Sequence, residues 1–151
     1  MPPGGPDAAT CQKTYIANLK HAAAECAKAN ITLLIEPINT RDMPGFFLNH
    51  SAQALDIIKA VGSDNLYFQY DIYHMQIMEG DLAPTIEKNL ALIPHMQLAD
   101  TPGRHEPGSG EINYDFLLPH IDKLGYQGWI GCEYKPATTT EAGLSWTKPY
   151  L

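Results

Sequence analysis

Residues 33–39, LLIEPIN, decide the fold class. The aliphatic run Leu33–Ile35 predicts a short buried β-strand, and Pro37 ends it because proline cannot donate a backbone hydrogen bond to a sheet. Glu36, a side chain that is costly to bury, stands at the carboxyl end of the strand. An apolar run followed by a polar side chain occurs three more times along the chain, so this arrangement is a pattern rather than an isolated feature.

Between these runs, apolar residues recur at the spacing of a helix. The expected strands cover residues 31–35, 66–70, 94–98 and 129–134. The expected helices cover residues 11–29, 52–61, 81–92 and 114–124, with a weak one at 141–147. Ser51 is the expected N-cap of the second helix and Gly62 its end, whereas Pro119 is expected to kink the fourth helix or to reset its start.

Alternating strands and helices indicate an α/β fold built from parallel βα units with right-handed crossovers. The strands are apolar on both faces, as in parallel sheets that helices cover. No linker divides the sequence, so residues 1–151 are expected to form a single domain, with residues 1–9 a disordered lead-in rich in Pro and Gly.

A polar oxygen donor stands at each expected strand end. The four are Glu36, Asp71, Gln97 and Glu133, spaced by 35, 26 and 36 residues, each about one βα unit. Any one of them taken alone fits a helix cap or a surface position. Parallel strands, however, bring their carboxyl ends to one edge of the sheet, which is where such folds bind ligands. Crowded oxygen donors favour a hard divalent cation, Mg²⁺ or Mn²⁺, over zinc.

Two more polar side chains belong to the adjoining loops. His74 follows Asp71 by three residues, and Arg104 lies seven residues after Gln97. Each could be structural or solvated, but beside the strand ends each is a candidate substrate contact, since arginine grips carboxylates with two hydrogen bonds. The glycines of residues 107–113, PGSGEIN, lack a nucleotide-binding fingerprint and fit a loop that folds over the site.

Composition excludes several classes of partner. The chain of 151 residues has a net charge of −7, which argues against nucleic-acid or anionic-membrane binding but allows a small anionic substrate. No apolar run approaches the roughly 20 residues of a membrane span. The first ten residues show no signal-peptide pattern. Three cysteines without paired spacing, Cys11, Cys26 and Cys132, suit a reducing cytoplasm, which is the expected location.

Four blocks of sequence resemble the hydroxypyruvate isomerase family. They are IEPIN (35–39), YDIYHMQIMEGDL (70–82), HMQLADTPGRHEPGSGEINYDFL (95–117) and GWIGCEYKP with GLSW (128–136 and 143–146). The resemblance extends from about Thr14 to Leu151 and implies a xylose-isomerase-like TIM barrel, with ketose 3-epimerases and endonuclease IV as wider relatives. It implies Glu36, Asp71, Gln97 and Glu133 as metal ligands, Glu36 and Glu133 as the acid/base pair, and His74 and Arg104 as substrate contacts.

The chain departs from that family in length. A (β/α)8 barrel takes about 250 residues, whereas this sequence supplies four strands, which match strands 5–8 of the family's barrel. Half a barrel implies either a truncated product or two copies that pair their open edges to close the barrel.

The resemblance implies a metal-dependent isomerase in glyoxylate metabolism that interconverts hydroxypyruvate and tartronate semialdehyde through an enediolate. Two alternatives stay open. One is a related sugar-acid isomerase or ketose 3-epimerase, and the other is an inactive fragment that acts at most as an interaction module.

Overall fold

A computed structural model describes residues 5–150 of the chain. Within this part a four-stranded sheet has the order β1-β2-β3-β4, and every neighbouring pair is parallel. The strands are β1 (Leu33–Ile35), β2 (Leu66–Asp71), β3 (His95–Leu98) and β4 (Trp129–Cys132). Sequence order equals spatial order, which confirms the predicted α/β fold of successive parallel βα units.

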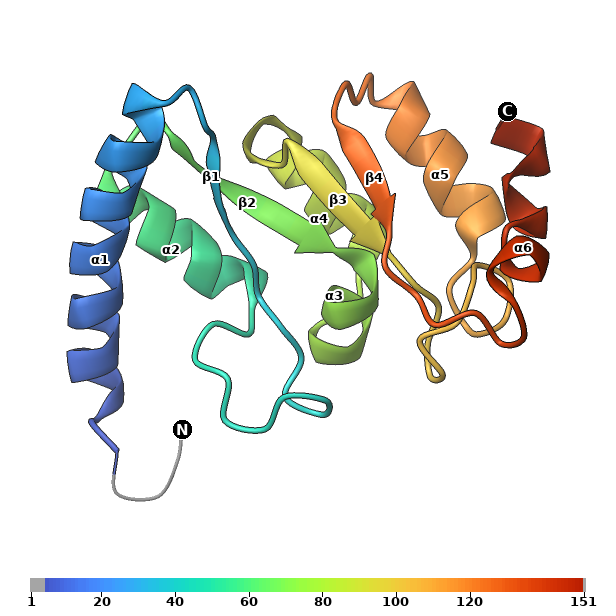
Figure 1. Cartoon of the computed structure of the whole chain (residues 1–151), viewed down its shortest axis with the longest axis horizontal. Helices are drawn as coiled ribbons and strands as arrows, with labels where there is room; N and C mark the ends of the chain where they lie inside the picture. The colour runs from blue at the N-terminus through green and yellow to red at the C-terminus, as the bar shows by residue number, and fades with distance from the viewer. Residues whose placement is uncertain (1–4, 151) are drawn as a thin grey trace.

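Helices cover one face of this sheet. Figure 1 shows α2 (Ser51–Val61) and α4 (Leu82–Asn89) crossing behind the strands, with α1 (Ala8–Lys28) beside β1 and α5 (Tyr114–Lys123) beside β4. The face toward the viewer carries no helix of the described chain. Four short elements complete the described fold, namely α3 (Ile72–Met78), α6 (Thr140–Gly143) and the 3₁₀-helices Leu90–Leu92 and Ser145–Tyr150.

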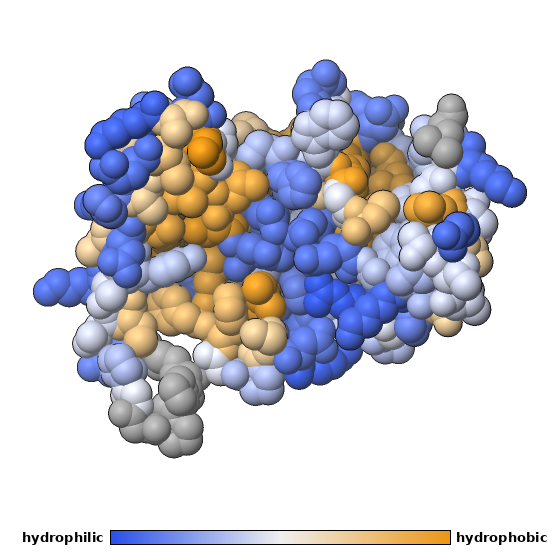
Figure 2. Space-filling view, in the orientation of Figure 1, coloured by the Kyte–Doolittle hydropathy of each residue, from blue (hydrophilic) through white to orange (hydrophobic). Residues whose placement is uncertain are grey.

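The two faces of the sheet differ in chemistry because side chains alternate along a strand. Phe68, Tyr70, Met96 and Leu98 are buried beneath the helices and form the centre of the core. The intervening residues of β2 and β3 are only half-buried and include polar side chains. Figure 2 shows the result on the uncovered face, where a hydrophilic band runs between hydrophobic areas.

The helix boundaries correct several expectations. Helix α1 begins at Ala8, where Asp7 caps it by accepting a hydrogen bond from the Thr10 amide, so the lead-in is shorter than the predicted residues 1–9. Residues 1–4 lie outside the described part. Gly62 ends α2 as predicted, with a φ of 65° that favours glycine.

Ser51 is the first residue of α2 rather than its N-cap, which is His50. The carboxylate of Glu79, just after α3, takes over the capping role, because it accepts hydrogen bonds from both the backbone amide and the hydroxyl of Ser51. Pro119 lies inside α5 without splitting it, so of the two expected effects, a kink or a reset of the start, the reset does not occur. Instead α5 starts where Asn113 accepts a hydrogen bond from the Phe116 amide.

No helix of the described chain combines the length and apolar character needed to cross a membrane.

Candidate functional site

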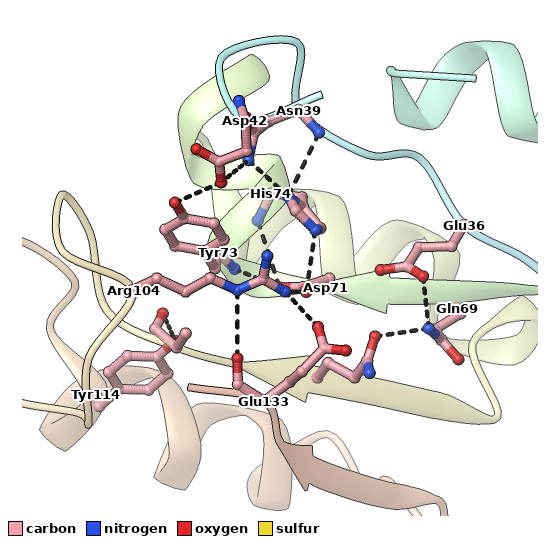
Figure 3. Close-up of polar contacts among 12 residues, drawn as sticks. Glu36, Asn39, Asp42, Gln69, Asp71, Tyr73, His74, Arg104, Tyr114 and Glu133 are labelled. Atoms are coloured by element: carbon pink, nitrogen blue, oxygen red, sulfur yellow. Dashed lines mark hydrogen bonds and ion pairs between the residues drawn. The ribbon is translucent and has the colours of Figure 1, made fainter. Parts of the chain in front are cut away.

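The carboxyl edge of the sheet gathers the polar side chains that the sequence predicted there. Glu36 directly follows β1, Asp71 ends β2, and Glu133 directly follows β4. One potential ligand atom from each of these three residues and from His74 lies within 4.8 Å of all the others. Figure 3 shows the four side chains converging from separate strands and from α3. Three of the four predicted ligands therefore form one cluster, and His74 joins them.

Gln97 lies beside this cluster. Its backbone is in register with Asp71 across the β2–β3 pair, and its side-chain oxygen accepts a hydrogen bond of 2.6 Å from Gln69 Nε2. The same Gln69 nitrogen donates to Glu36 Oε2 at 2.8 Å. Gln69 thus orients two of the predicted ligands at once. A carbonyl oxygen has two lone pairs, so Gln97 Oε1 retains one for a cation.

Gln69 itself was missed by sequence reasoning. Gln69 lies within the apolar run LYFQY, which reads as a wholly buried strand. Its alternate position nevertheless places Gln69 on the face of the sheet opposite to the buried Phe68 and Tyr70.

Asp71 has a structural and a chemical role. Its side chain is 1% exposed, and Oδ1 accepts hydrogen bonds from the Tyr73 and His74 amides, which makes Asp71 the N-cap of α3. Oδ2 points the other way, 3.6 Å from His74 Nε2 and 3.8 Å from Arg104 Nη2. Sequence analysis assigned no helix to residues 72–78, since seven residues are too few for a clear helical period. The cap nevertheless fixes the carboxylate toward the cluster.

Arg104 reaches the cluster from the long loop after β3. Its Nη2 lies 2.5 Å from Glu133 Oε2, and its guanidinium carbon lies 4.9 Å from the centre of the Tyr73 ring. The Arg104 carbonyl accepts a hydrogen bond of 2.8 Å from the Lys135 amide, which ties this loop to the segment after β4. Arg104 has a φ of 54°, a conformation that non-glycine residues seldom adopt without surrounding support. The surrounding contacts therefore fix Arg104 beside Glu133 and Asp71.

Asp100 supplies that support and was also missed. Its carboxylate is buried and accepts hydrogen bonds from four backbone amides, those of Thr101, Gly108, Gly110 and Ile112, at 2.9–3.1 Å. At Gly110 a Cβ atom would come within 2.0 Å of the Thr101 carbonyl oxygen, so only glycine fits there. A buried acid that follows a strand and precedes a glycine-rich loop is the sequence signal that could have identified this residue.

His74 is held from behind by the loop after β1. Its Nδ1 lies 2.6 Å from Asn39 Nδ2, and Asn39 is fixed in turn by Asp42. Asp42 also accepts a hydrogen bond of 2.7 Å from the Tyr73 hydroxyl. Asn39, Asp42 and Tyr73 were not singled out from the sequence, because their relation to His74 and Arg104 arises only in the folded chain.

The carboxyl groups of the cluster resist simultaneous ionisation. Burial, with the neighbouring charges of Asp71 and Glu133, raises the pKa of Glu36 to about 7. Burial likewise raises the pKa of Asp71 to about 7, against the lowering effect of the His74 amide and Arg104. Burial and Arg104 lower the pKa of His74 to about 4, so this imidazole is neutral at pH 7.

This donor set fits a hard divalent cation. Three carboxylates and one amide oxygen are the ligand types that Mg²⁺ and Mn²⁺ prefer. A double positive charge would compensate the buried negative charge, whose desolvation is the main cause of the two raised pKa values. Arg104 offers only partial compensation, since its guanidinium lies 3.8 Å from Asp71 but much closer to Glu133. Glu36, Asp71 and Glu133 could hold such an ion, and Gln97 is the predicted fourth ligand.

Comparison with known proteins agrees with this geometry. The family model described as xylose isomerase-like TIM barrel matches residues 1–150. The 2-oxo-tetronate isomerase of Cupriavidus necator is 53% identical over 99% of this chain, and the hydroxypyruvate isomerase of Escherichia coli K12 is 53% identical over 98%. The putative hydroxypyruvate isomerase of Homo sapiens is 43% identical over 94%.

Solved structures give the same fold. The crystal structure of an AP endonuclease of family 2 from Brucella melitensis has a TM-score of 0.93 and 46% identity, over 97% of this chain and 57% of that one. The 3-keto-D-glucoside 4-epimerase of E. coli has a TM-score of 0.86 and 25% identity, over 99% of this chain and 58% of that one.

The chain spans 57% of the length of both bacterial isomerases. The match of sequence and fold nevertheless covers nearly all of this chain. It belongs to the xylose isomerase-like TIM barrel family.

Proposed function

We propose that this chain carries the cation-binding half of an isomerase that interconverts a short 2-oxo acid and its hydroxy-aldehyde isomer, with hydroxypyruvate and tartronate semialdehyde as the pair. The observation that carries the proposal is the convergence of Glu36, Asp71, His74 and Glu133 at one edge of a parallel sheet. The names of the relatives at 53% identity support the same class of reaction.

The reaction moves two hydrogens between neighbouring carbon and oxygen atoms. A carboxylate removes a proton from C3 of hydroxypyruvate, the electron pair forms the C2–C3 double bond of an enediolate, and a proton is returned to C2. The hydroxyl proton on O3 passes to O2, so atoms and charge balance. Mg²⁺ or Mn²⁺, when bound, lowers the pKa of the C3 proton and stabilises negative charge on the enediolate oxygens.

Glu36 and Glu133 suit the two proton transfers. They come from β1 and β4, the two outer strands of the sheet, yet their side chains converge on the same small volume. In the cation-free chain burial raises the pKa of Glu36 to about 7, and a carboxyl group with a pKa perturbed in this way is a candidate general acid/base. Glu133 is the second proposed acid/base group, and its Oε2 is held in place by Arg104 Nη2 at 2.5 Å.

Arg104 and His74 are the proposed substrate contacts. Arg104 donates to Glu133 through Nη2, which meets the carboxylate, and through Nε, which meets the backbone carbonyl. Its remaining N–H groups suit a substrate carboxylate. An anionic three-carbon acid is thereby held with its reacting carbons near the carboxylates. A four-carbon 2-oxo acid is the second candidate, favoured by the relatives named 2-oxo-tetronate isomerase in C. necator and Pectobacterium atrosepticum.

The outer strands also bear on the proposal. Neither β1 nor β4 has a second strand neighbour within residues 5–150, and Trp129 at the start of β4 is 81% exposed. We propose that a second half-barrel, either from another copy of this chain or from the remainder of a longer protein, pairs with these edges. A closed barrel would complete the pocket wall, and the working location would be the cytoplasm.

Replacing Glu133 with Gln tests the proposal. Turnover of hydroxypyruvate should fall by about 10²–10⁴-fold, the usual share of a positioned acid/base group, while the far-ultraviolet circular dichroism stays that of the parent. The exposed Glu87→Gln on α4 is the matched control and should retain full activity. Unchanged turnover in Glu133→Gln would remove this residue from the proposed mechanism.

A further inference from the structure

We propose that Asn39, held in place by Asp42, is a positioning residue that fixes His74 in the tautomer with its proton on Nε2. His74 then faces the cluster as a hydrogen-bond donor and not as a cation ligand. The structural part of this inference stands without the proposed function. Only its consequence for turnover rests on that function.

Two donors of Asn39 point at one nitrogen of His74. The side-chain Nδ2 lies 2.6 Å from His74 Nδ1, and the backbone N–H donates to the same Nδ1 at 3.4 Å. Neither donor can accept a hydrogen bond. His74 Nδ1 must therefore present a lone pair, and both residues are buried, so water does not compete for that position.

Asp42 determines which way the Asn39 amide faces. The Asp42 amide donates to Asn39 Oδ1 at 2.7 Å, while Asn39 Nδ2 donates to Asp42 Oδ2 at 3.1 Å. Rotating the Asn39 amide by 180° would set its oxygen against the Asp42 carboxylate and its NH₂ against the Asp42 N–H. Both contacts would be lost, so the hydrogen-bond network allows one orientation only.

The same carboxylate anchors the other substrate contact. Asp42 Oδ2 accepts a hydrogen bond of 2.7 Å from the Tyr73 hydroxyl, and the Tyr73 ring lies under the guanidinium of Arg104. Figure 3 shows this chain of contacts from the loop after β1 to both His74 and Arg104. One loop therefore orients two groups that α3 and the β3–α5 loop bring to the cluster.

The tautomer decides what His74 offers to the site. A neutral imidazole has one N–H, and with the lone pair on Nδ1 the proton sits on Nε2, the nitrogen 3.6 Å from Asp71 Oδ2. A protonated Nε2 cannot ligate a cation, although a His74 ring nitrogen lies within 4.8 Å of all three carboxylates of the cluster. Oxygen atoms alone would then form the ligand set, which favours Mg²⁺ or Mn²⁺ over softer ions.

The test is a charge-conserving exchange of partners, Asn39→Asp with Asp42→Asn in one protein. The new carboxylate at 39 accepts from His74 Nδ1–H, so the proton should leave Nε2. Two-bond ¹H–¹⁵N correlation spectra of the cation-free chain report the tautomer, and His74→Gln identifies the resonances of this ring. We expect protonated Nε2 in the parent, protonated Nδ1 in the double variant, and no change in Asn18→Asp/Asp56→Asn, where both positions are exposed on helices.

A second measurement covers the case in which the double variant does not fold. Pulsed electron paramagnetic resonance of the Mn²⁺-loaded parent should show no ¹⁴N coupling from a directly bound imidazole. Asn39→Ala removes the side-chain donor and should give a mixture of both tautomers in the correlation spectra. Protonated Nδ1 in the parent, a bound imidazole in its Mn²⁺ spectrum, or an unmixed parent tautomer in Asn39→Ala would overturn the inference.

Turnover separates this inference from the proposed function. If the parent converts hydroxypyruvate, the double variant should lose about 10–100-fold in kcat/KM, as is usual when a supporting hydrogen-bond partner is changed. A parent without activity on 2-oxo acids but with protonated Nε2 would refute the proposed function and leave the positioning role of Asn39 intact.

Discussion

The Asp100 carboxylate organises the whole loop that presents Arg104, so its replacement by asparagine should have a large effect. Asparagine keeps the shape of the side chain and one acceptor oxygen, which continues to serve the Thr101 and Ile112 amides. The NH₂ group takes the place of Oδ2, the atom that accepts from the Gly108 and Gly110 amides at 3.0 and 2.9 Å. The NH₂ group of the new asparagine would then face the N–H groups of Gly108 and Gly110, and neither side could accept a hydrogen bond.

The magnitude follows from these two lost contacts. A donor left without a partner costs about 1–3 kcal/mol when buried. Both glycines are exposed residues and their hydrogen bonds are only partly buried, so the lower part of that range applies. We expect Asp100→Asn to lower the free energy of unfolding by about 2–4 kcal/mol. The conformation of Arg104, with its φ of 54°, should lose definition with the loop.

Urea unfolding followed by circular dichroism measures the loss, with Asp56→Asn on the exposed face of α2 as the control for the charge change. The control should stay within about 0.5 kcal/mol of the parent, as exposed substitutions usually do. If Asp100→Asn matches the control, the four amide contacts do not hold the loop, and the explanation of how Arg104 is positioned is wrong.

Two further predictions concern charge at the site. Glu36 and Asp71 have folded-state pKa values of about 7, above their ordinary values, so they stabilise the cation-free chain fully at low pH and lose that contribution as pH rises through about 7. Thermal unfolding of the cation-free chain should therefore show a decrease in Tm between pH 5.5 and pH 8 that is smaller in Glu36→Gln, and equal decreases would contradict the assignment. Arg104→Lys keeps the charge but loses the planar fork, and should raise KM for hydroxypyruvate by about 10–100-fold, the equivalent of one charge-assisted hydrogen bond. An unchanged KM would exclude Arg104 from binding the substrate carboxylate.

The fold was predictable because its signals are local. Three aliphatic residues, Leu33–Ile35, indicate a strand, and the polar Glu36 after them indicates where it ends. Each later strand repeats this pattern. Parallel order then follows from the helices between them, and the convergence of strand-end side chains follows from parallel order. The sequence therefore predicts that Glu36, Asp71 and Glu133 meet at one edge of the sheet, as they do.

The supporting residues could not be predicted in the same way. Gln69 sits in an aromatic run and acts across two neighbouring strands, and Asn39 acts on a ring 35 residues away. Asp100 binds amides up to 12 residues further along a loop without periodicity. Such contacts depend on tertiary geometry, which leaves no regular spacing in the sequence. The capping of α2 by Glu79 instead of a residue of its own helix has the same origin.

The central claim is that oxygen atoms of Glu36, Asp71, Gln97 and Glu133 jointly bind one divalent cation. Isothermal titration of the chelator-treated chain with Mn²⁺ tests it most directly, with Glu36→Ala as the variant and Glu25→Ala, on the exposed face of α1, as the control. We predict saturable binding of one ion in the parent and in the control, and its loss in Glu36→Ala. Absence of saturable binding in the parent, or equal binding in Glu36→Ala, would contradict the claim.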